Sequence, residues 1–100
     1  MNYQVIVSEA AESDIQESFF WYKYRNESLA QLFIQHLDEV LQIILKNPNQ
    51  FQERAKGLRV GFLRKFPFGV HYIIENKRVL VIGVFHTSRD PKEWIKRMQP

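Results

Sequence analysis

The chain contains no cysteine, only four glycines and four prolines among its 100 residues, and no apolar run long enough to cross a membrane. The lack of cysteine excludes disulfides and thiolate metal ligands, and it fits a reducing cytoplasm. The glycines are too scattered for a phosphate-binding loop, and the three histidines are not at metal-ligand spacing. The N-terminus has no charged segment followed by an apolar stretch, so no secretory signal is visible. We therefore expect a cytoplasmic protein with no metal, no other cofactor and no membrane association.

Hydrophobic residues make up 45% of the chain and 14% of it is aromatic, enough for a core without covalent crosslinks. The length fits one domain over residues 1–100, because no linker, repeat or low-complexity stretch divides it. The net charge of +3 is mildly basic and favours acidic partners without naming one.

The segment Val79–Phe85 is apolar on both alternating sets of residues and rich in β-branched side chains, which is typical of an interior strand. Val70–Ile74 is the expected antiparallel partner, joined to it through a tight turn at Asn76-Lys77. Polar side chains, His86 and Arg89 among them, appear directly after the second strand ends. A rigid strand that delivers such groups to the surface is a good platform for binding or chemistry.

The remaining chain predicts elements that cover this hairpin. The first are a strand at Tyr3–Val7 and a helix capped by Ser8. A second helix follows, with a capping box at Ser28 and Gln31, and it ends at Asn47-Pro48 with Asn47 in the left-handed conformation. The last are a strand at Leu58–Phe66 with a bulge near Gly61 and a helix from Pro91 to Met98 capped by Asp90. Residues 49–57 are polar and expected to form a loop. The order β-α-α-β-β-β-α predicts an α+β fold, in which a small, mostly antiparallel sheet of about four strands packs against an N-terminal helical hairpin.

The first helix is unusually aromatic. Phe19, Phe20, Trp21 and Tyr22 are expected mostly in the core, since they follow an apolar stripe at helical spacing. The alternative is that Trp21 and Tyr24 form a surface where a partner helix docks. In the second helix, Ile34 and Ile43 lie off the main apolar stripe, either at its edge or on a partner-binding surface.

The motifs of this chain, taken in order, resemble those of the RelE/ParE superfamily of bacterial type II toxin–antitoxin toxins. They are Trp21-Tyr22 and Phe33 in the helical hairpin, the stop at Asn47-Pro48, the run Leu63-Arg64-Lys65-Phe66-Pro67-Phe68, Tyr72, and His86-Thr87-Ser88-Arg89-Asp90-Pro91 with Trp94. The likeness covers almost the whole chain. It implies a growth-inhibiting toxin that a cognate antitoxin neutralises, with Trp21, Tyr24 and Ile34 as candidates for the antitoxin-binding surface.

The resemblance implies one of two targets. RelE-like members cut messenger RNA on the ribosome with basic residues and often a tyrosine, whereas ParE-like members poison DNA gyrase and lack that nuclease set. Here Gly69 stands where RelE-like nucleases usually carry an arginine, the tyrosine of the last segment is matched at best by Trp94, and the paired lysines have no counterpart beyond Arg59. These departures favour the ParE-like mode, with the RelE-like endonuclease as the alternative and an inert relative as a third interpretation.

If the chain is a nuclease, the candidate catalytic residues are His71, His86, Arg64 and Arg89, because metal-free RNA cleavage needs an acid, a base and cations. The expected hairpin register pairs His71 with Ile82, which puts His71 and His86 on one sheet face. Structural roles compete with this hypothesis: a hydrogen bond for His71, a fastening of the strand end by His86, and an ion pair of Arg89 with Asp90 or Glu93.

Whether the chain is an enzyme stays open at this point. For either macromolecular target, we expect a contact surface made of the basic and aromatic residues near the strand ends. Its candidates are Arg59, Arg64, Lys65, His86, Arg89 and Trp94, the last being the expected packing anchor of the C-terminal helix.

Overall fold

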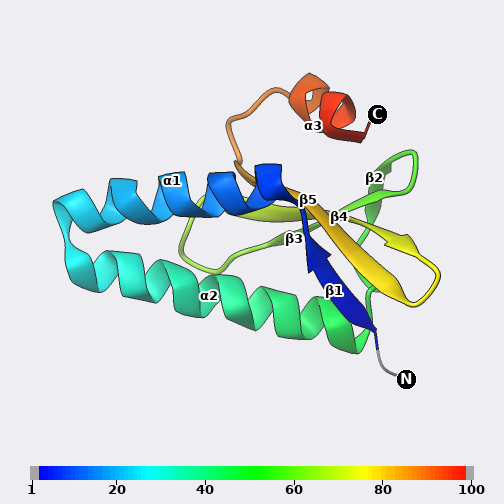
Figure 1. Cartoon of the computed structure of the whole chain (residues 1–100), viewed down its shortest axis with the longest axis horizontal. Helices are drawn as coiled ribbons and strands as arrows, with labels where there is room; N and C mark the ends of the chain where they lie inside the picture. Colours follow the sequence, from blue (N-terminus) through cyan, green and yellow to red (C-terminus); the bar gives the residue numbers. More distant parts are fainter. Residues whose placement is uncertain (1–2, 99–100) are drawn as a thin grey trace.

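A computed structural model describes residues 3–98, which form five strands and three helices (Figure 1). The strands are β1 (Gln4–Val7), β2 (Glu53–Ala55), β3 (Leu58–Phe62), β4 (Phe68–Glu75) and β5 (Arg78–His86), and the helices are α1 (Glu9–Arg25), α2 (Glu27–Lys46) and α3 (Pro91–Met98).

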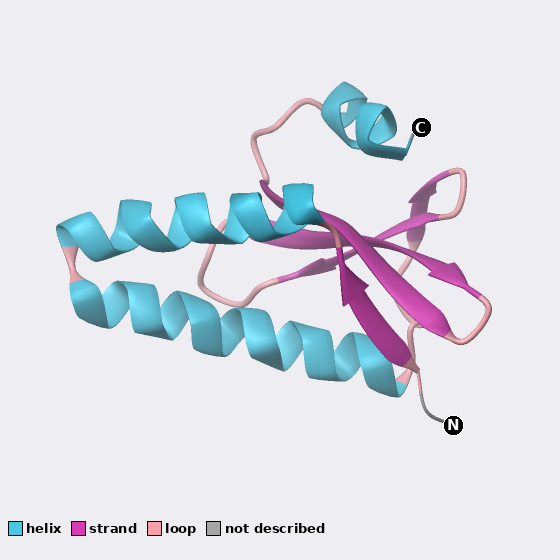
Figure 2. Ribbon diagram, viewed as in Figure 1, coloured by secondary structure: helices cyan, strands magenta, loops and turns pink. Residues whose placement is uncertain are grey.

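The strands form one sheet in the order β1-β5-β4-β3-β2 (Figure 2). All neighbouring strands are antiparallel except β1, which pairs parallel to β5. The predicted α+β fold, with its helical hairpin and its interior strand at Val79–Phe85, is confirmed. The expected strand count was one too low, because β2 lies within residues 49–57, which were predicted to be a loop. Its three residues, two of them charged, are too few to reveal a strand by alternation.

Asn26 alone separates α1 from α2, so the two helices form a tight antiparallel hairpin. Ser8 caps α1 as predicted, and its Oγ accepts from the backbone N–H of Ala11 at 3.1 Å. The capping box predicted at Ser28 is wrong: Asn26 caps α2, with its Oδ1 accepting from the Ser28 N–H at 2.9 Å. Asn47 ends α2 with φ of −154°, so its predicted left-handed conformation is wrong as well.

The core lies between the helical hairpin and one face of the sheet. Its fully or nearly buried members from α2 are Phe33, Leu37, Val40 and Ile44, and those from the strands include Val70, Tyr72, Val79, Val81 and Val84. An aromatic cluster closes the core under the hairpin tip, where Tyr22 contacts the rings of Phe33, Phe66 and Phe68 at centroid distances of 5.2–6.2 Å. Tyr22 therefore fixes α1 over the start of β4.

The strand predicted at Leu58–Phe66 ends at Phe62, because the next residues turn back toward β4. Lys65 has φ of +63°, and the Leu63 N–H donates to the Phe68 carbonyl at 3.0 Å. The bulge predicted near Gly61 is absent, since the β3–β4 register runs without a shift. Gly61 instead allows α2 to pack closely: a Cβ there would lie 3.0 Å from Val40 Cγ1.

A bulge does occur in β5. The β4–β5 pairing runs as expected from Glu75↔Arg78 to Tyr72↔Val81, and then skips Ile82, so that His71 lies opposite Gly83. A side chain at Gly83 would collide with the Phe85 ring, because a Cβ there would lie 2.6 Å from Phe85 Cε2. The predicted pairing of His71 with Ile82 was thus wrong by one residue.

The bulge places His71 and His86 on opposite faces, so the prediction that they share a face is wrong. His86 lies opposite Phe68 on the face that the hairpin covers, whereas His71 packs on Phe85 and on Trp94 of α3. One inserted residue reverses the direction of every side chain that follows it.

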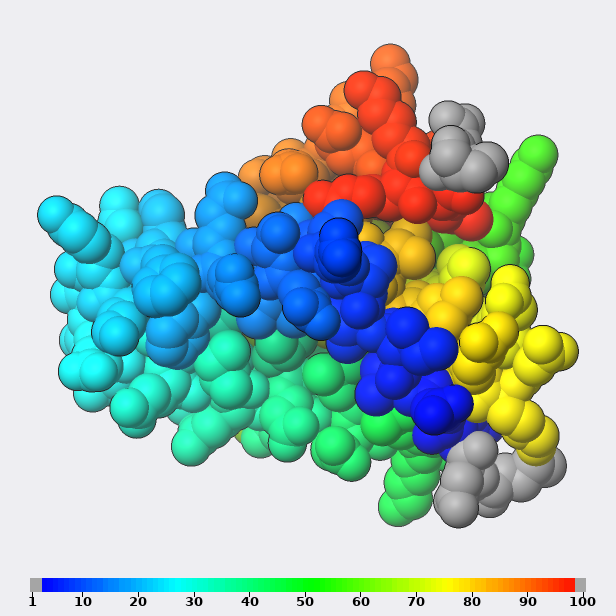
Figure 3. All heavy atoms as spheres, viewed as in Figure 1, coloured from blue at the N-terminus to red at the C-terminus, as the bar shows by residue number. Residues whose placement is uncertain are grey.

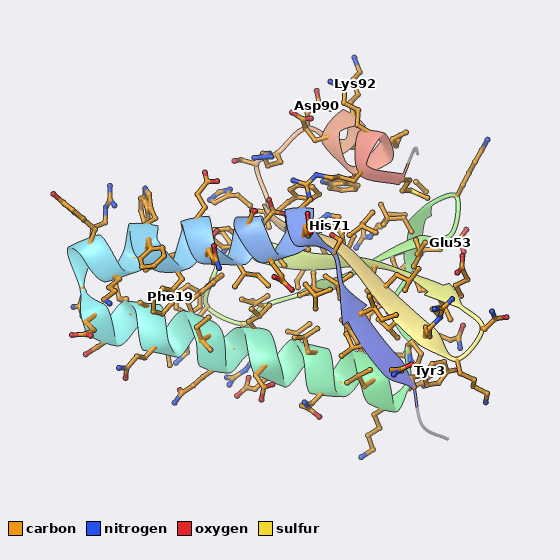
Figure 4. The ribbon with its side chains drawn as sticks, viewed as in Figure 1. Tyr3, Phe19, Glu53, His71, Asp90 and Lys92 are labelled. Atoms are coloured by element: carbon orange, nitrogen blue, oxygen red, sulfur yellow. The ribbon has the colours of Figure 1, made fainter. Side chains whose placement is uncertain are left out.

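Helix α3 lies on the sheet face opposite the hairpin, where Trp94 packs on His71, and its atoms also touch those at the start of α1 (Figure 3). Trp94 stacks on His71 with ring centroids 4.6 Å apart, and Arg97 forms an ion pair with Asp14 of α1 at 3.0 Å. Asp90 caps the helix as predicted, with Oδ1 accepting from the Lys92 N–H at 2.9 Å. Figure 4 shows Asp90 and Lys92 pointing away from the sheet.

Candidate functional site

A cleft of about 470 Å³ opens between α1 and the end of β5. Its lining residues are Asp14, Glu17, Ser18, Trp21, Tyr22, Pro67, Phe68, Val84, Phe85, His86 and Arg89. These residues come from α1, from Pro67 and the start of β4, from the end of β5 and from the polar segment that follows it. Of the residues predicted as functional, Trp21, His86 and Arg89 are brought together here.

His86 lies at the strand end with a defined hydrogen-bonding state. The backbone N–H and the hydroxyl of Ser88 approach its Nδ1 at 3.0 and 2.8 Å. Since the N–H must donate, Nδ1 is the unprotonated nitrogen and the proton of the neutral ring is on Nε2. The ring also packs edge-on against Phe68, at 5.3 Å between centroids. His86 thus fastens the strand end and still borders the cleft.

Arg89 extends over the face of Phe85, with its guanidinium carbon 5.1 Å from the ring centroid. The alternative prediction of an ion pair with Asp90 or Glu93 is not borne out, because no carboxylate within residues 3–98 pairs with Arg89. The guanidinium is therefore available to an anion from outside.

His71 does not line this cleft; it lies on the sheet face that α3 covers, packed against Phe85 and Trp94. Its side chain is only 2% exposed, and its Nδ1–H donates to the Gly69 carbonyl at 3.0 Å. Burial lowers the pKa of His71 to about 4, and the hydrogen bond to Gly69 offsets only part of that effect. A buried, neutral imidazole under Trp94 is poorly suited to exchange protons with a substrate.

The basic residues of the β3 region are used within the fold. Arg59 donates from Nη1 to the carbonyls of Phe51 at 2.6 Å and Asn49 at 3.3 Å, which closes the loop after α2. Arg64 forms a salt bridge with Glu39 of α2 at 3.1 Å. Neither Arg59 nor Arg64 lines the cleft.

Two further motif residues have structural partners. The Tyr72 hydroxyl donates to the Pro48 carbonyl at 2.6 Å, and burial raises the pKa of Tyr72 to about 12. Trp94 packs on His71, as expected for an anchor of the last helix. Lys65 is exposed in the β3–β4 loop, apart from the cleft.

Within the described residues, no three His, Asp or Glu side chains are grouped as around a metal ion.

The sequence matches the family model described as "ParE toxin of type II toxin-antitoxin system, parDE" over residues 5–91. The chain belongs to this family of ParE toxins. Among solved structures, one from the "Chromosomal ParDE TA system from P. aeruginosa" has the same fold, with a TM-score of 0.74 and 16% identity over 84% of this chain and 95% of that one. No curated protein sequence gives a significant match. The predicted RelE/ParE resemblance is thereby confirmed, and the chain is the toxin of a type II module whose family implies a cognate antitoxin.

The ParE toxin exposes an aromatic surface at the end of α1 near the hairpin tip. Tyr24 is 92% exposed and Trp21 is 53% exposed, with the Arg25 guanidinium 3.6 Å above the Trp21 ring. The prediction that Phe20 and Trp21 belong to the core is wrong, because α1 packs through Ala11, Ile15 and Tyr22 instead. Ile34, on α2, is 37% exposed. No helix within the described part of the toxin is long and apolar enough to span a membrane.

Two acidic residues around the cleft were not singled out from the sequence. Asp14 accepts from the Val84 N–H and from Arg97, each at 3.0 Å, while Glu17 has no ion pair within residues 3–98. Asp14 and Glu17 are three residues apart on a helix, a spacing typical of any solvated face. The contacts of Asp14 span 70 and 83 residues, so no local pattern indicates them.

Proposed function

We propose that this ParE-family toxin arrests growth in the cytoplasm by binding and poisoning DNA gyrase, and that it is not a ribonuclease. The observation that carries the proposal is the dispersal of the candidate catalytic residues. His71 and His86 point to opposite sheet faces, Arg89 follows the strand end and stacks over Phe85, and Arg64 is paired with Glu39 on α2.

Metal-free RNA cleavage requires a general base, a general acid and a cation within reach of one phosphate. His71 is buried and neutral, and Tyr72 has a raised pKa and donates to a backbone carbonyl. Gly69 supplies no cation on β4, and the space beside it is occupied by Val60 and Phe62. These features argue against a phosphate-sized catalytic centre of the RelE kind.

A protein target suits the surface better. His86 and Arg89 border a cleft with apolar walls, a composition typical of protein and ligand recognition. Of the other predicted target contacts, Arg59, Arg64 and Trp94 have partners within the fold, so we assign them supporting roles. We assign the antitoxin to the hairpin surface around Trp21, Tyr24 and Ile34, where an amphipathic helix could cover exposed apolar groups.

The test is induced expression without the antitoxin, with plasmid topology and messenger integrity followed in the same culture. We expect growth arrest with relaxed or cleaved plasmid and intact ribosome-bound messenger, and purified toxin should inhibit gyrase supercoiling. Codon-specific cuts near ribosomes that disappear in His86→Ala would establish the RelE-like alternative. Normal growth at good soluble yield would count against both modes.

A further inference from the structure

The cleft between α1 and the end of β5 holds two opposite charges without ion-pair partners in the described part of the fold. Arg89, on the strand-end wall, has no carboxylate partner within residues 3–98. Glu17, on the α1 wall, has no ion pair there either. The third charged residue of the lining, Asp14, is neutralised by Arg97. An occupant is thus offered an anion site on one wall and a cation site on the other.

The space between the two charges is apolar. Phe68 and Val84 are buried, Pro67 and the half-exposed ring of Trp21 form the sides, and Phe85 lies beneath Arg89. A volume of about 470 Å³ is within the range of sites that bury a small organic group, and it accommodates one or two side chains. The walls therefore suit an apolar side chain and the floor offers no catalytic group beyond His86.

The charge distribution selects among anionic partners. A nucleic acid backbone carries one negative charge per phosphate, and a continuous polyanion entering the cleft would meet Glu17 within the same small volume. A single carboxylate beside Arg89, on the wall opposite Glu17, avoids this repulsion. The guanidinium fork also matches carboxylate geometry. The arrangement thus favours an acidic peptide over RNA or DNA.

We propose that this cleft is the anchor site for the toxin's protein target, and that it takes a segment with an apolar side chain next to a carboxylate. The carboxylate pairs with Arg89, assisted by the Nε2–H of His86, and a basic residue of the same segment pairs with Glu17. This inference rests on the proposed function in that the target is taken to be gyrase.

Trp21 belongs both to the cleft and to the surface assigned to the antitoxin. An antitoxin helix laid on Trp21 covers one wall of the cleft, so the target and the antitoxin compete for the toxin. Neutralisation then needs no conformational change in the toxin.

The experiment measures the affinity of purified full-length toxin for purified gyrase, together with inhibition of supercoiling. Arg89→Glu and the milder Arg89→Gln are compared with Arg54→Glu, which makes the same charge change at an exposed arginine that stacks on Phe62 outside the cleft. We expect Arg89→Glu to weaken gyrase binding at least about tenfold, Arg89→Gln to weaken it less, and Arg54→Glu to change it less than about twofold. Circular dichroism and urea midpoints check that each variant is folded.

A second pair of variants tests the apolar wall. Trp21→Ala should weaken gyrase binding, whereas Phe20→Ala, on the same helix but outside the cleft, should leave it unchanged. Wild-type toxin that fails to inhibit supercoiling overturns the proposed function itself. Wild-type inhibition with equal effects of Arg89→Glu and Arg54→Glu overturns only the anchor site. If the Arg89 and Trp21 variants lose only antitoxin binding, or lose messenger cleavage, the cleft is assigned to another partner and the proposal is also overturned.

Discussion

Arg97 of α3 and Asp14 of α1 form a bidentate ion pair across the bulge of β5, with two nitrogen–oxygen distances of 3.0 Å. The same side chains satisfy the backbone of the bulge: Asp14 accepts from the Val84 N–H at 3.0 Å, and Arg97 donates to the Ile82 carbonyl at 2.8 Å. A bulged residue leaves ladder groups unpaired, and these contacts replace the missing ones. The Asp14–Arg97 pair therefore stabilises the one-residue register shift in β5 that turns His86 toward the cleft.

Replacing Arg97 by methionine keeps most of the apolar stem but removes the charge and its donors. Asp14 and Arg97 are 15% and 26% exposed, so the loss leaves a largely buried carboxylate without its partner. We expect the free energy of unfolding to fall by about 2 kcal/mol, with local loosening of α3. Urea denaturation and amide hydrogen exchange in α3 measure both effects.

The control for Arg97→Met is Arg78→Met, which breaks the exposed pair between Glu75 and Arg78 at the β4–β5 turn. Exposed pairs contribute little, so this variant should lose less than about 1 kcal/mol. Equal losses in the two variants would mean that the Asp14–Arg97 pair has no special role at the bulge.

The buried His71 makes stability depend on pH. Its pKa is lowered from 6.5 to about 4 in the folded protein, so between these values the unfolded chain binds more protons than the folded one. The contribution of the neutral His71 to the free energy of unfolding is therefore fully present above pH 6.5. It is lost as the pH falls toward about 4, and the loss amounts to about 3 kcal/mol across that interval. Chemical denaturation at a series of pH values should show wild type losing more stability than His71→Leu over this range.

Val60→Ala is the control for the pH experiment, because Val60 is the buried neighbour of His71 on β3 and does not titrate. Its unfolding free energy should be lower than that of wild type by a similar amount at every pH. If His71→Leu shows the same slope as wild type, the acid sensitivity arises from other groups.

The elements of this fold were predictable wherever the signal is local. The alternation-free apolar run at Val79–Phe85, the helical stripe of α2 and the Asp90-Pro91 start of α3 each identified an element correctly. The errors at Ser28 and Asn47 concern caps, where neighbouring residues compete for the same role. The strand β2 was missed because three residues, two of them charged, give no periodic signal.

The site was predictable only in part, for a physical reason. The motif at the end of β5 pointed to His86 and Arg89, and the structure does bring them to one cleft. The separation of His71 from His86 depends on the bulge at Ile82, whose stabilising partner Asp14 is 70 residues from Val84. The exposure of Trp21 could not be read from α1 alone, since consecutive aromatic residues from Phe19 to Tyr22 place rings on several sides of that helix.

Close packing of α2 on the sheet depends on Gly61. A Cβ at Gly61 would lie 3.0 Å from Val40 Cγ1 and 3.2 Å from Ile44 Cδ1, closer than ordinary van der Waals contact. We expect Gly61→Ala to destabilise the toxin by about 1–3 kcal/mol through overpacking. In the Val40→Ala background, where the first of these methyl groups is gone, the same substitution should cost less. Strictly additive losses in the double-mutant cycle would contradict this explanation.

Tyr72 is expected to stabilise the toxin without taking part in its activity. Tyr72→Phe removes the 2.6 Å hydrogen bond to Pro48 and leaves that buried carbonyl without the hydroxyl donor, so stability should fall by about 1–2 kcal/mol. Tyr24→Phe, which removes a hydroxyl from a 92% exposed ring, should leave it unchanged. Urea midpoints measure the difference, and growth arrest should persist in both variants. Loss of arrest in a Tyr72→Phe toxin that remains folded would instead point to a catalytic phenol.

The exposed apolar side chains of the hairpin give a final prediction about antitoxin binding. Tyr24→Ala removes contact area that solvent already reaches, so toxin stability should change by less than about 0.5 kcal/mol, whereas Ile34→Ala also removes buried apolar area and should lose somewhat more. Antitoxin affinity should fall by at least about fivefold for Tyr24→Ala if that ring is a central anchor of the interface. Ile95→Ala is the matched control, because Ile95 is an exposed apolar residue on α3, away from the tip of the hairpin (Figure 1). Calorimetric titration of each variant with purified antitoxin measures these affinities. Equal losses of antitoxin affinity for Ile34→Ala and Ile95→Ala would show that the antitoxin also wraps over α3.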